Sequence, residues 1–164
     1  MCHRIVMMVL ILVSSLLAEE KTLTLTKTNQ SIAIDGFIDD TEWSGSSIAD
    51  EFFEIMPGEN VSPSVKTIIY ITYDDEQLFV GYKAQDNPDD IRANISKRDE
   101  IYEDDMVGIM LDPQNTEVMA YSFSCNPFGN QADMQKVNQK ENDSWDAVWS
   151  SAGRITESGF EVEM

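Results

Sequence analysis

The apolar residues of this chain recur in short runs with a period of two, and this pattern constrains the fold more than any other feature. Between residues 106 and 112, Val107, Ile109 and Leu111 alternate with Met106, Gly108 and Met110, as side chains do on the two faces of a strand. No long segment carries a helical stripe, so the pattern predicts an all-β fold, an antiparallel β-sandwich of jelly-roll-like type. Strands are expected at 22–26, 31–35, 52–56, 65–73, 77–84, 91–95, 106–112, 118–126, 131–137, 147–155 and 160–164. The segments 65–73 and 77–84 predict an antiparallel hairpin.

The sequence predicts an export signal at the N-terminus and an incomplete sandwich at the C-terminus. Residues 1–18 have a short basic start and an apolar run, which predict an export signal cleaved after Ala18; an uncleaved anchor is the alternative. We expect a lead-in strand within 19–30 and the sandwich over 31–164. The last alternating segment stops without a polar tail, so we expect the sandwich to be incomplete at its C-terminus.

Charge and two rare residue types exclude several functions. The formal net charge is −19, so the chain should repel nucleic acid and anionic lipid and accept neutral, cationic or basic partners. The only histidine is His3, inside the expected signal. The mature chain therefore has no Ser-His-Asp catalysis, histidine zinc site or His-ligated haem. Cys2 also leaves with the signal, so Cys125 should be a small core residue without a disulfide partner.

Three blocks of sequence together resemble the family 9 carbohydrate-binding modules. They are Ile34 to Trp43, with an Asp-Gly…Trp pattern, the hairpin segment Tyr73 to Val80, and Tyr102 to Asp112. The resemblance covers residues 31–164. It implies a jelly-roll-like sandwich that binds sugars without catalysis and is often attached to O-glycosyl hydrolases. Residues 145–163 are similar to a subgroup in which the module opens a long exported bacterial protein with a β-rich remainder.

The resemblance also implies a set of ligand contacts. Family members hold a sugar between two aromatic rings; the first falls on Tyr102, and the second would lie beyond Met164. Asn126 matches a ligand-binding asparagine, whereas Gly108 and Ser124 stand where the family often has a carboxylate and an arginine. The residue pattern adds Trp145, which stands on a polar stretch, and Asp133, which could point to the same face, so the ligand-binding candidates are Tyr102, Asn126, Ser124, Trp145 and Asp133. From the residues alone, Tyr102 could instead cap the sandwich edge, Asn126 the turn after it, and Asp133 could be surface charge.

The acidic turns raise two further possibilities. Asp86, Asp89 and Asp90 could supply oxygen ligands to calcium, although an ordinary acidic turn explains them as well, and no other cofactor is expected. Glycoside hydrolysis needs two carboxylates across a scissile bond. No pair of carboxylates here stands in a recognisable catalytic motif, so we expect no enzymatic activity from this chain.

Two functional hypotheses follow. The first is a non-catalytic carbohydrate-binding module of an exported protein, in the periplasm, at the outer membrane or outside the cell. It would bind polysaccharide or oligosaccharide and serve polysaccharide breakdown by an attached domain. The alternative is an interaction or assembly domain that packs on the β-rich remainder of an outer-membrane-associated protein and binds no sugar. The methionine-rich face of residues 106–110 would suit such packing.

Overall fold

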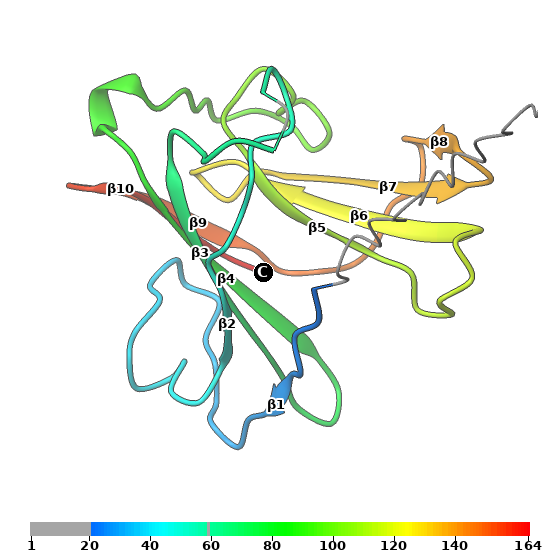
Figure 1. The fold of residues 1–164 in the computed structure, drawn as a ribbon, viewed down its shortest axis with the longest axis horizontal. Helices are drawn as coiled ribbons and strands as arrows, with labels where there is room; N and C mark the ends of the chain where they lie inside the picture. Colours follow the sequence, from blue (N-terminus) through cyan, green and yellow to red (C-terminus); the bar gives the residue numbers. More distant parts are fainter. Residues whose placement is uncertain (1–20, 59) are drawn as a thin grey trace, which may run out of the picture.

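Two β-sheets, stacked face to face at an angle, form the molecule (Figure 1). The computed structural model describes residues 21–58 and 60–164, so the expected export signal at 1–18 lies outside the described residues. The first sheet has the order β1-β3-β4-β10-β9, with β2 also paired to β3, and the second has the order β5-β6-β7-β8. The all-β sandwich predicted from the apolar period is confirmed.

The first sheet is built from six strands, which are β1 (Thr26–Lys27), β2 (Ser47–Ala49), β3 (Lys66–Tyr73), β4 (Leu78–Gln85), β9 (Ala152–Thr156) and β10 (Gly159–Glu163). The second is built from β5 (Val107–Leu111), β6 (Met119–Cys125), β7 (Gln131–Val137) and β8 (Lys140–Asn142). A single 3-10 turn, η1 (Pro88–Asp90), stands between β4 and β5. In the described ranges, no helix is both long enough and apolar enough to span a bilayer.

The predicted hairpin is present as β3 and β4, which pair from Lys66↔Gln85 to Tyr73↔Leu78. Its turn is closed by Asp74, whose carboxylate accepts hydrogen bonds from the backbone N–H groups of Glu76 and Gln77 at 2.8 and 2.7 Å. These bonds lower the pKa of Asp74, with that from Glu76 contributing most. The Asp74 side chain therefore accepts hydrogen bonds in this turn in place of a backbone carbonyl.

Several predicted strands are absent or shorter than expected. No strand forms at residues 31–35 or 91–95. The predicted strand 22–26 is present only at its last residue, and the predicted strand 147–155 is paired only from Ala152 onward. The segment 52–56 makes a single β-bridge, between Glu54 and Val61. In 31–36 and 91–95, backbone N–H groups donate to carboxylates instead of a neighbouring strand: those of Asp35 and Gly36 to Glu163, and that of Arg92 to Asp105. Strand propensity without a free edge to pair with gives an extended but unpaired segment.

The main core lies between the sheets and combines side chains from both. Val80, Tyr82 and Val162 of the first sheet pack with Cys125 of the second, and Val107, Ile109 and Phe123 pack against them. The predicted inward face of β5 is thus confirmed, since Met106 and Met110 on the other face are about half exposed. Cys125 is fully buried in this core, as expected for a small core residue.

A second, smaller core covers the other face of the first sheet. There the N-terminal segment places Ile38 and Trp43 against Phe79. Gly81 permits this approach, because a Cβ at that position would lie 3.1 Å from Ile38 Cδ1 and 3.2 Å from the Trp43 ring. Trp43 is 3 % exposed. The tryptophan of the Asp-Gly…Trp pattern is therefore a core residue.

Candidate functional site

Tyr102 projects from a tight turn whose two ends are buried. The N–H of Asp104 donates to the carbonyl oxygen of Ile101 at 3.0 Å, which closes the turn. Ile101 is 0 % and Asp104 8 % exposed, whereas Tyr102 is 48 % exposed. Partial burial raises the pKa of the Tyr102 phenol, and the nearby negative charges of Asp99 and Asp143 raise that pKa further. The turn thus presents an aromatic ring to solvent from a fixed base.

The base of this turn is the carboxylate of Asp104. One of its oxygens accepts from Asn94 Nδ2 at 2.7 Å, and the other accepts from the Asn94 backbone N–H at 3.1 Å and from Asn126 Nδ2 at 2.8 Å. These bonds lower the pKa of Asp104, with that from Asn126 contributing most. The next residue, Asp105, accepts from the backbone N–H and the guanidinium of Arg92 at 2.9 and 3.3 Å. The acidic residues after Tyr102 therefore tie its turn to residues 92–94.

Asn126 does not reach solvent, although the resemblance implies that its amide faces a ligand. It is 0 % exposed. Its Nδ2 donates to the Asn94 carbonyl oxygen and to Asp104, both at 2.8 Å, and its Oδ1 accepts from the N–H groups of Phe128 and Asn130 at 3.1 and 2.9 Å. These four bonds occupy the two donors and two acceptor positions of the amide. The alternative reading, in which Asn126 organises the turn after β6, describes what the structure shows.

Ser124 and Gly108 lie opposite each other on the outer face of the second sheet, the face that points away from the main core. Ser124 is half-buried, and its hydroxyl has no hydrogen-bond partner among the described residues. A Cβ at Gly108 would lie 2.7 Å from both the Phe123 carbonyl oxygen and Ser124 Oγ. The backbone of β6 therefore leaves no room at position 108 for the carboxylate side chain that the family often carries there.

Asp133 is buried at 2 % exposure, so it is not a surface charge, and its assignment as a ligand contact stays a prediction. Its carboxylate accepts from Arg98 Nε and Nη2 at 3.1 and 2.6 Å, from the Ala147 N–H at 2.7 Å, and from Trp149 Nε1 at 3.2 Å. Arg98 also donates to the Gln131 side chain and to the Ala147 carbonyl oxygen. Asp133 is thus the centre of an ion-paired network that joins β7 to the segments before and after it.

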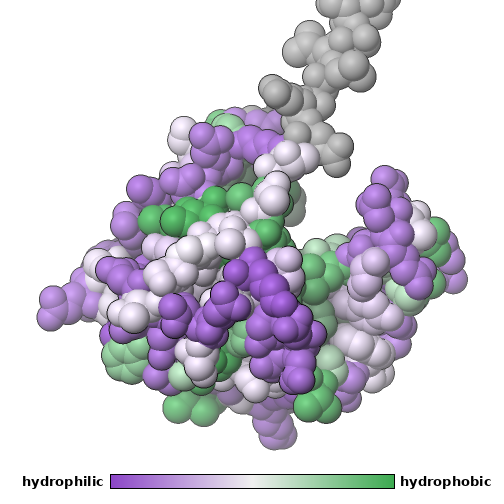
Figure 2. All heavy atoms as spheres, turned by 90° about the horizontal axis from the view of Figure 1, so that it is seen from below, coloured by the Kyte–Doolittle hydropathy of each residue, from purple (hydrophilic) through white to green (hydrophobic). Residues whose placement is uncertain are grey.

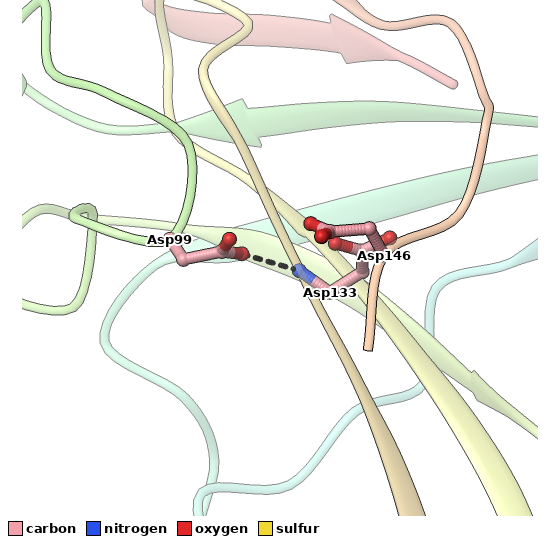
Figure 3. A group of neighbouring side chains, drawn as sticks. All are labelled: Asp99, Asp133 and Asp146. Atoms are coloured by element: carbon pink, nitrogen blue, oxygen red, sulfur yellow. Dashed lines mark hydrogen bonds between the residues drawn. The ribbon is translucent and has the colours of Figure 1, made fainter. Parts of the chain in front are cut away.

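Asp99, Asp133 and Asp146 are the acidic residues whose carboxylate oxygens converge in the described chain, within 4.8 Å of one another (Figure 3). Asp99 accepts from the Asp133 N–H at 3.1 Å, and Arg98 Nε lies 3.3 Å from Asp146. The guanidinium of Arg98 already supplies the positive charge that a cation would bring. A metal ion would have to displace it and break its bidentate pair with Asp133.

The suggested calcium candidates Asp86, Asp89 and Asp90 do not gather into such a cluster. Asp86 accepts from the Asn87 N–H at 2.7 Å, and Asp90 accepts from Asn87 Nδ2 at 2.9 Å. The 3-10 turn Pro88–Asp90 is capped by the Asn87 side chain, whose Oδ1 accepts from the Asp89 N–H at 3.4 Å. The hydrogen bonds of an ordinary acidic turn account for their positions, and calcium binding by these residues stays a prediction.

Trp145 lies on the opposite side of β6 from Ser124. Its ring packs against Tyr121 at 4.8 Å and against Phe123 at 6.1 Å between centroids, and Phe123 in turn meets Trp149 at 5.5 Å. Because Phe123 points into the sandwich and Ser124 away from it, Trp145 and Ser124 cannot line one site on a single face. Trp145 is a half-buried member of an inner aromatic cluster.

An apolar slot of about 170 Å³ opens between the sheets beside this cluster. Side chains from both sheets line it, among them Leu78, Ile109, Leu111 and Met164. It offers almost no hydrogen-bonding group for sugar hydroxyls. Over the surface in Figure 2, hydrophilic side chains predominate and apolar ones form separate patches between them.

Of the candidates from the sequence, Tyr102 is exposed, Ser124 and Trp145 are half-buried, and Asn126 and Asp133 are buried. Sequence reasoning missed the roles of Asp104, Asn94 and Arg98. The one local signal was the acidic run after Tyr102, since the partners that fix it lie 10 to 22 residues away along the chain.

Fold and site together define the class of the protein. It is a β-sandwich binding domain that displays an aromatic ring on an anchored turn. Residues 34–164 match the family described as "Carbohydrate family 9 binding domain-like", and the chain belongs to this family. Membership supports carbohydrate binding, and domains of this class are typically non-catalytic. No curated protein and no solved structure matches the chain.

Proposed function

We propose that this chain is a non-catalytic module that binds polysaccharide or oligosaccharide through the exposed ring of Tyr102. The observation that carries the proposal is the position of that ring. It is half exposed between two buried residues of one turn, in a domain of a carbohydrate-binding family. An aromatic ring held in this way can stack on the apolar face of a sugar without losing much side-chain freedom on binding.

The strength of such binding should be modest. Stacking that removes about 60 Å² of apolar surface from water contributes about 1.5 kcal/mol. The hydroxyl of Ser124, which lies two residues before Asn126 on the same side of β6, is available to donate or accept one further bond. Neither Gly108 nor Ser124 supplies the charge-assisted bonds that the family pattern often has, each worth about 1.5–3 kcal/mol.

We further propose that the module is exported and serves polysaccharide breakdown by an attached domain. The apolar N-terminal run, which is typical of an export signal, and the frequent association of such modules with glycoside hydrolases support this. The module would act in the periplasm, at the outer membrane or outside the cell. Its role would be to hold the attached domain near its substrate and raise the local substrate concentration.

Titration calorimetry tests the binding proposal. A panel of glucose, cello-oligosaccharides and xylo-oligosaccharides should give heat with at least one sugar for the unmodified chain, and Tyr102→Ala should lose at least tenfold in affinity. Tyr102→Phe keeps the stacking ring and should retain most of the binding. Tyr73→Ala is the matched control, because Tyr73 is also exposed, at 37 %, but ends β3 in the other sheet. Equal losses for Tyr73→Ala and Tyr102→Ala would contradict the proposal.

The slot between the sheets favours a second candidate, the interaction or assembly domain without a sugar ligand. Its apolar lining, and separately the exposed Met106 and Met110 on the opposite face of the second sheet, suit packing against another protein surface. Two results together would favour this candidate over the first. No sugar of the panel would give heat of binding, and Met106 and Met110 would become buried when the remainder of the parent protein is present.

A further inference from the structure

We infer that Asn126 is a positioning residue for sugar recognition: through Asp104 it locks the turn that carries Tyr102, and it makes no contact with the sugar itself. This inference rests on the proposed function, because it assumes that the Tyr102 ring is the surface on which the sugar stacks. It assigns Asn126 a role different from the one that its place in the sequence suggested.

The first step is the geometry of the link. The Asn126 amide lies where β6 ends, and its Nδ2 reaches Asp104 at 2.8 Å. Asp104 closes the turn from Ile101, so only one residue separates the carboxylate that Asn126 holds from the ring that faces solvent. A change in the position of Asp104 therefore moves Tyr102 directly.

The second step is that Asn94 braces the same carboxylate from another segment. Asn94 gives Asp104 two hydrogen bonds, at 2.7 and 3.1 Å, and its carbonyl oxygen receives the second Nδ2 hydrogen of Asn126 at 2.8 Å. Asn94, Asp104 and Asn126 are thus joined in a closed triangle of hydrogen bonds, to which Asn94 contributes backbone as well as side-chain groups. We call this triangle the Tyr102 clamp.

The third step is that all hydrogen-bonding positions of the Asn126 amide are already occupied within the protein. Its side chain is buried, and two backbone N–H groups occupy its oxygen. A sugar hydroxyl could reach this amide only after one of the four bonds had been broken. An effect of Asn126 on sugar affinity is therefore indirect, through the residues that its amide holds, and of these Asp104 belongs to the turn that carries Tyr102.

Release of the clamp should weaken binding by a limited amount. Without the Asn126 bond, the Tyr102 turn samples more conformations, and these must be lost again when a sugar binds. The ordering of one such side chain corresponds to a loss of about three- to tenfold in affinity. The loss should be smaller than that of Tyr102→Ala.

The decisive variant is Asn126→Ser, with Asn130→Ser as its matched control. Asn130 belongs to the same turn after β6, and its Nδ2 bonds the Ser96 carbonyl oxygen at 2.5 Å, but it does not touch Asp104. Fluorotyrosine labelling of the full chain, with the Tyr102 signal assigned from Tyr102→Phe, reports the ring without any ligand. Asn126→Ser should shift and narrow the Tyr102 signal, and Asn130→Ser should leave it unchanged. Asp104→Asn is a second test of the clamp if Asn126→Ser does not fold.

A double-mutant cycle with cellotetraose, followed by an NMR titration that reaches millimolar dissociation constants, separates the direct and indirect roles. If Asn126 acts through the ring, Asn126→Ser weakens binding in the unmodified chain but has no further effect in Tyr102→Ala. An equal loss in both backgrounds, or an unmoved Tyr102 signal in Asn126→Ser, would overturn the inference. Absence of cellotetraose binding by the unmodified chain would count against the proposed function, whereas the fluorine signals would still decide the role of Asn126.

Discussion

The sharpest stability prediction concerns Glu163, a carboxylate buried at 0 % exposure in the last strand. Oε2 accepts from the backbone N–H groups of Asp35 and Gly36 at 2.9 and 2.7 Å, and Oε1 accepts from Trp43 Nε1 at 2.8 Å. All three partners are donors. In Glu163→Gln, an amide NH₂ must replace one of the two oxygens and will face a buried N–H. At least one buried donor is then left without a partner, at a cost of about 1–3 kcal/mol.

Urea unfolding at pH 7, followed by tryptophan fluorescence, measures this cost. Glu157→Gln is the control, because Glu157 is exposed in the turn between β9 and β10 and should change the free energy of unfolding by less than about 0.5 kcal/mol. If the two variants unfold at the same urea concentration, the carboxylate does not hold the N-terminal segment onto the sheet.

The difference in unfolding free energy between the unmodified chain and Glu163→Gln should also depend on pH. Burial is the largest influence on Glu163 and raises its pKa above the usual 4.5 despite the three hydrogen bonds that lower it. A carboxyl group whose pKa rises on folding stabilises the fold most at low pH, and that contribution is lost as the pH rises from about 4.5 through the folded pKa. The stability gap between the unmodified chain and Glu163→Gln should therefore narrow as the pH increases over this window.

Three other predictions concern the core and the site. Asp133→Asn should lower the free energy of unfolding by about 3–5 kcal/mol, because it breaks the ion pair of Arg98 inside the network, and urea unfolding measures it. Gly108→Ala should destabilise the chain by about 1–3 kcal/mol, since its Cβ meets the Phe123 carbonyl oxygen; Ser122→Ala on the same face should not. Cys125, whose pKa burial raises to about 11, should resist a thiol reagent at pH 8 in the native chain and react at once in urea.

The sequence was sufficient for the parts of the fold that depend on local pattern. The alternation of Val107 and Ile109, and the hairpin from 65 to 84, follow from the strand period and from turn chemistry, and both are present. The unpaired segments 31–35 and 91–95 could not be foreseen, because their backbone donors go to carboxylates far along the chain. Propensity indicates an extended conformation but not whether an edge is free to receive it.

The candidate site divides in the same way. Tyr102 was found because its aromatic side chain precedes an acidic turn and a strand, which is a local signal. Asn126 and Asp133 were assigned to the ligand from their place in the chain, yet both are buried by partners distant in sequence. The sequence around a polar residue on a strand does not show whether its side chain faces solvent or is buried and hydrogen-bonded inside the protein.

The account depends most on the ring of Tyr102 as the surface where a sugar docks. The direct measurement is the dissociation constant for the sugar panel, determined in parallel for the unmodified chain, Tyr102→Ala and Tyr102→Phe. We expect binding of one sugar class, retained in Tyr102→Phe and at least tenfold weaker in Tyr102→Ala. Sugar binding of undiminished affinity in Tyr102→Ala would contradict the account.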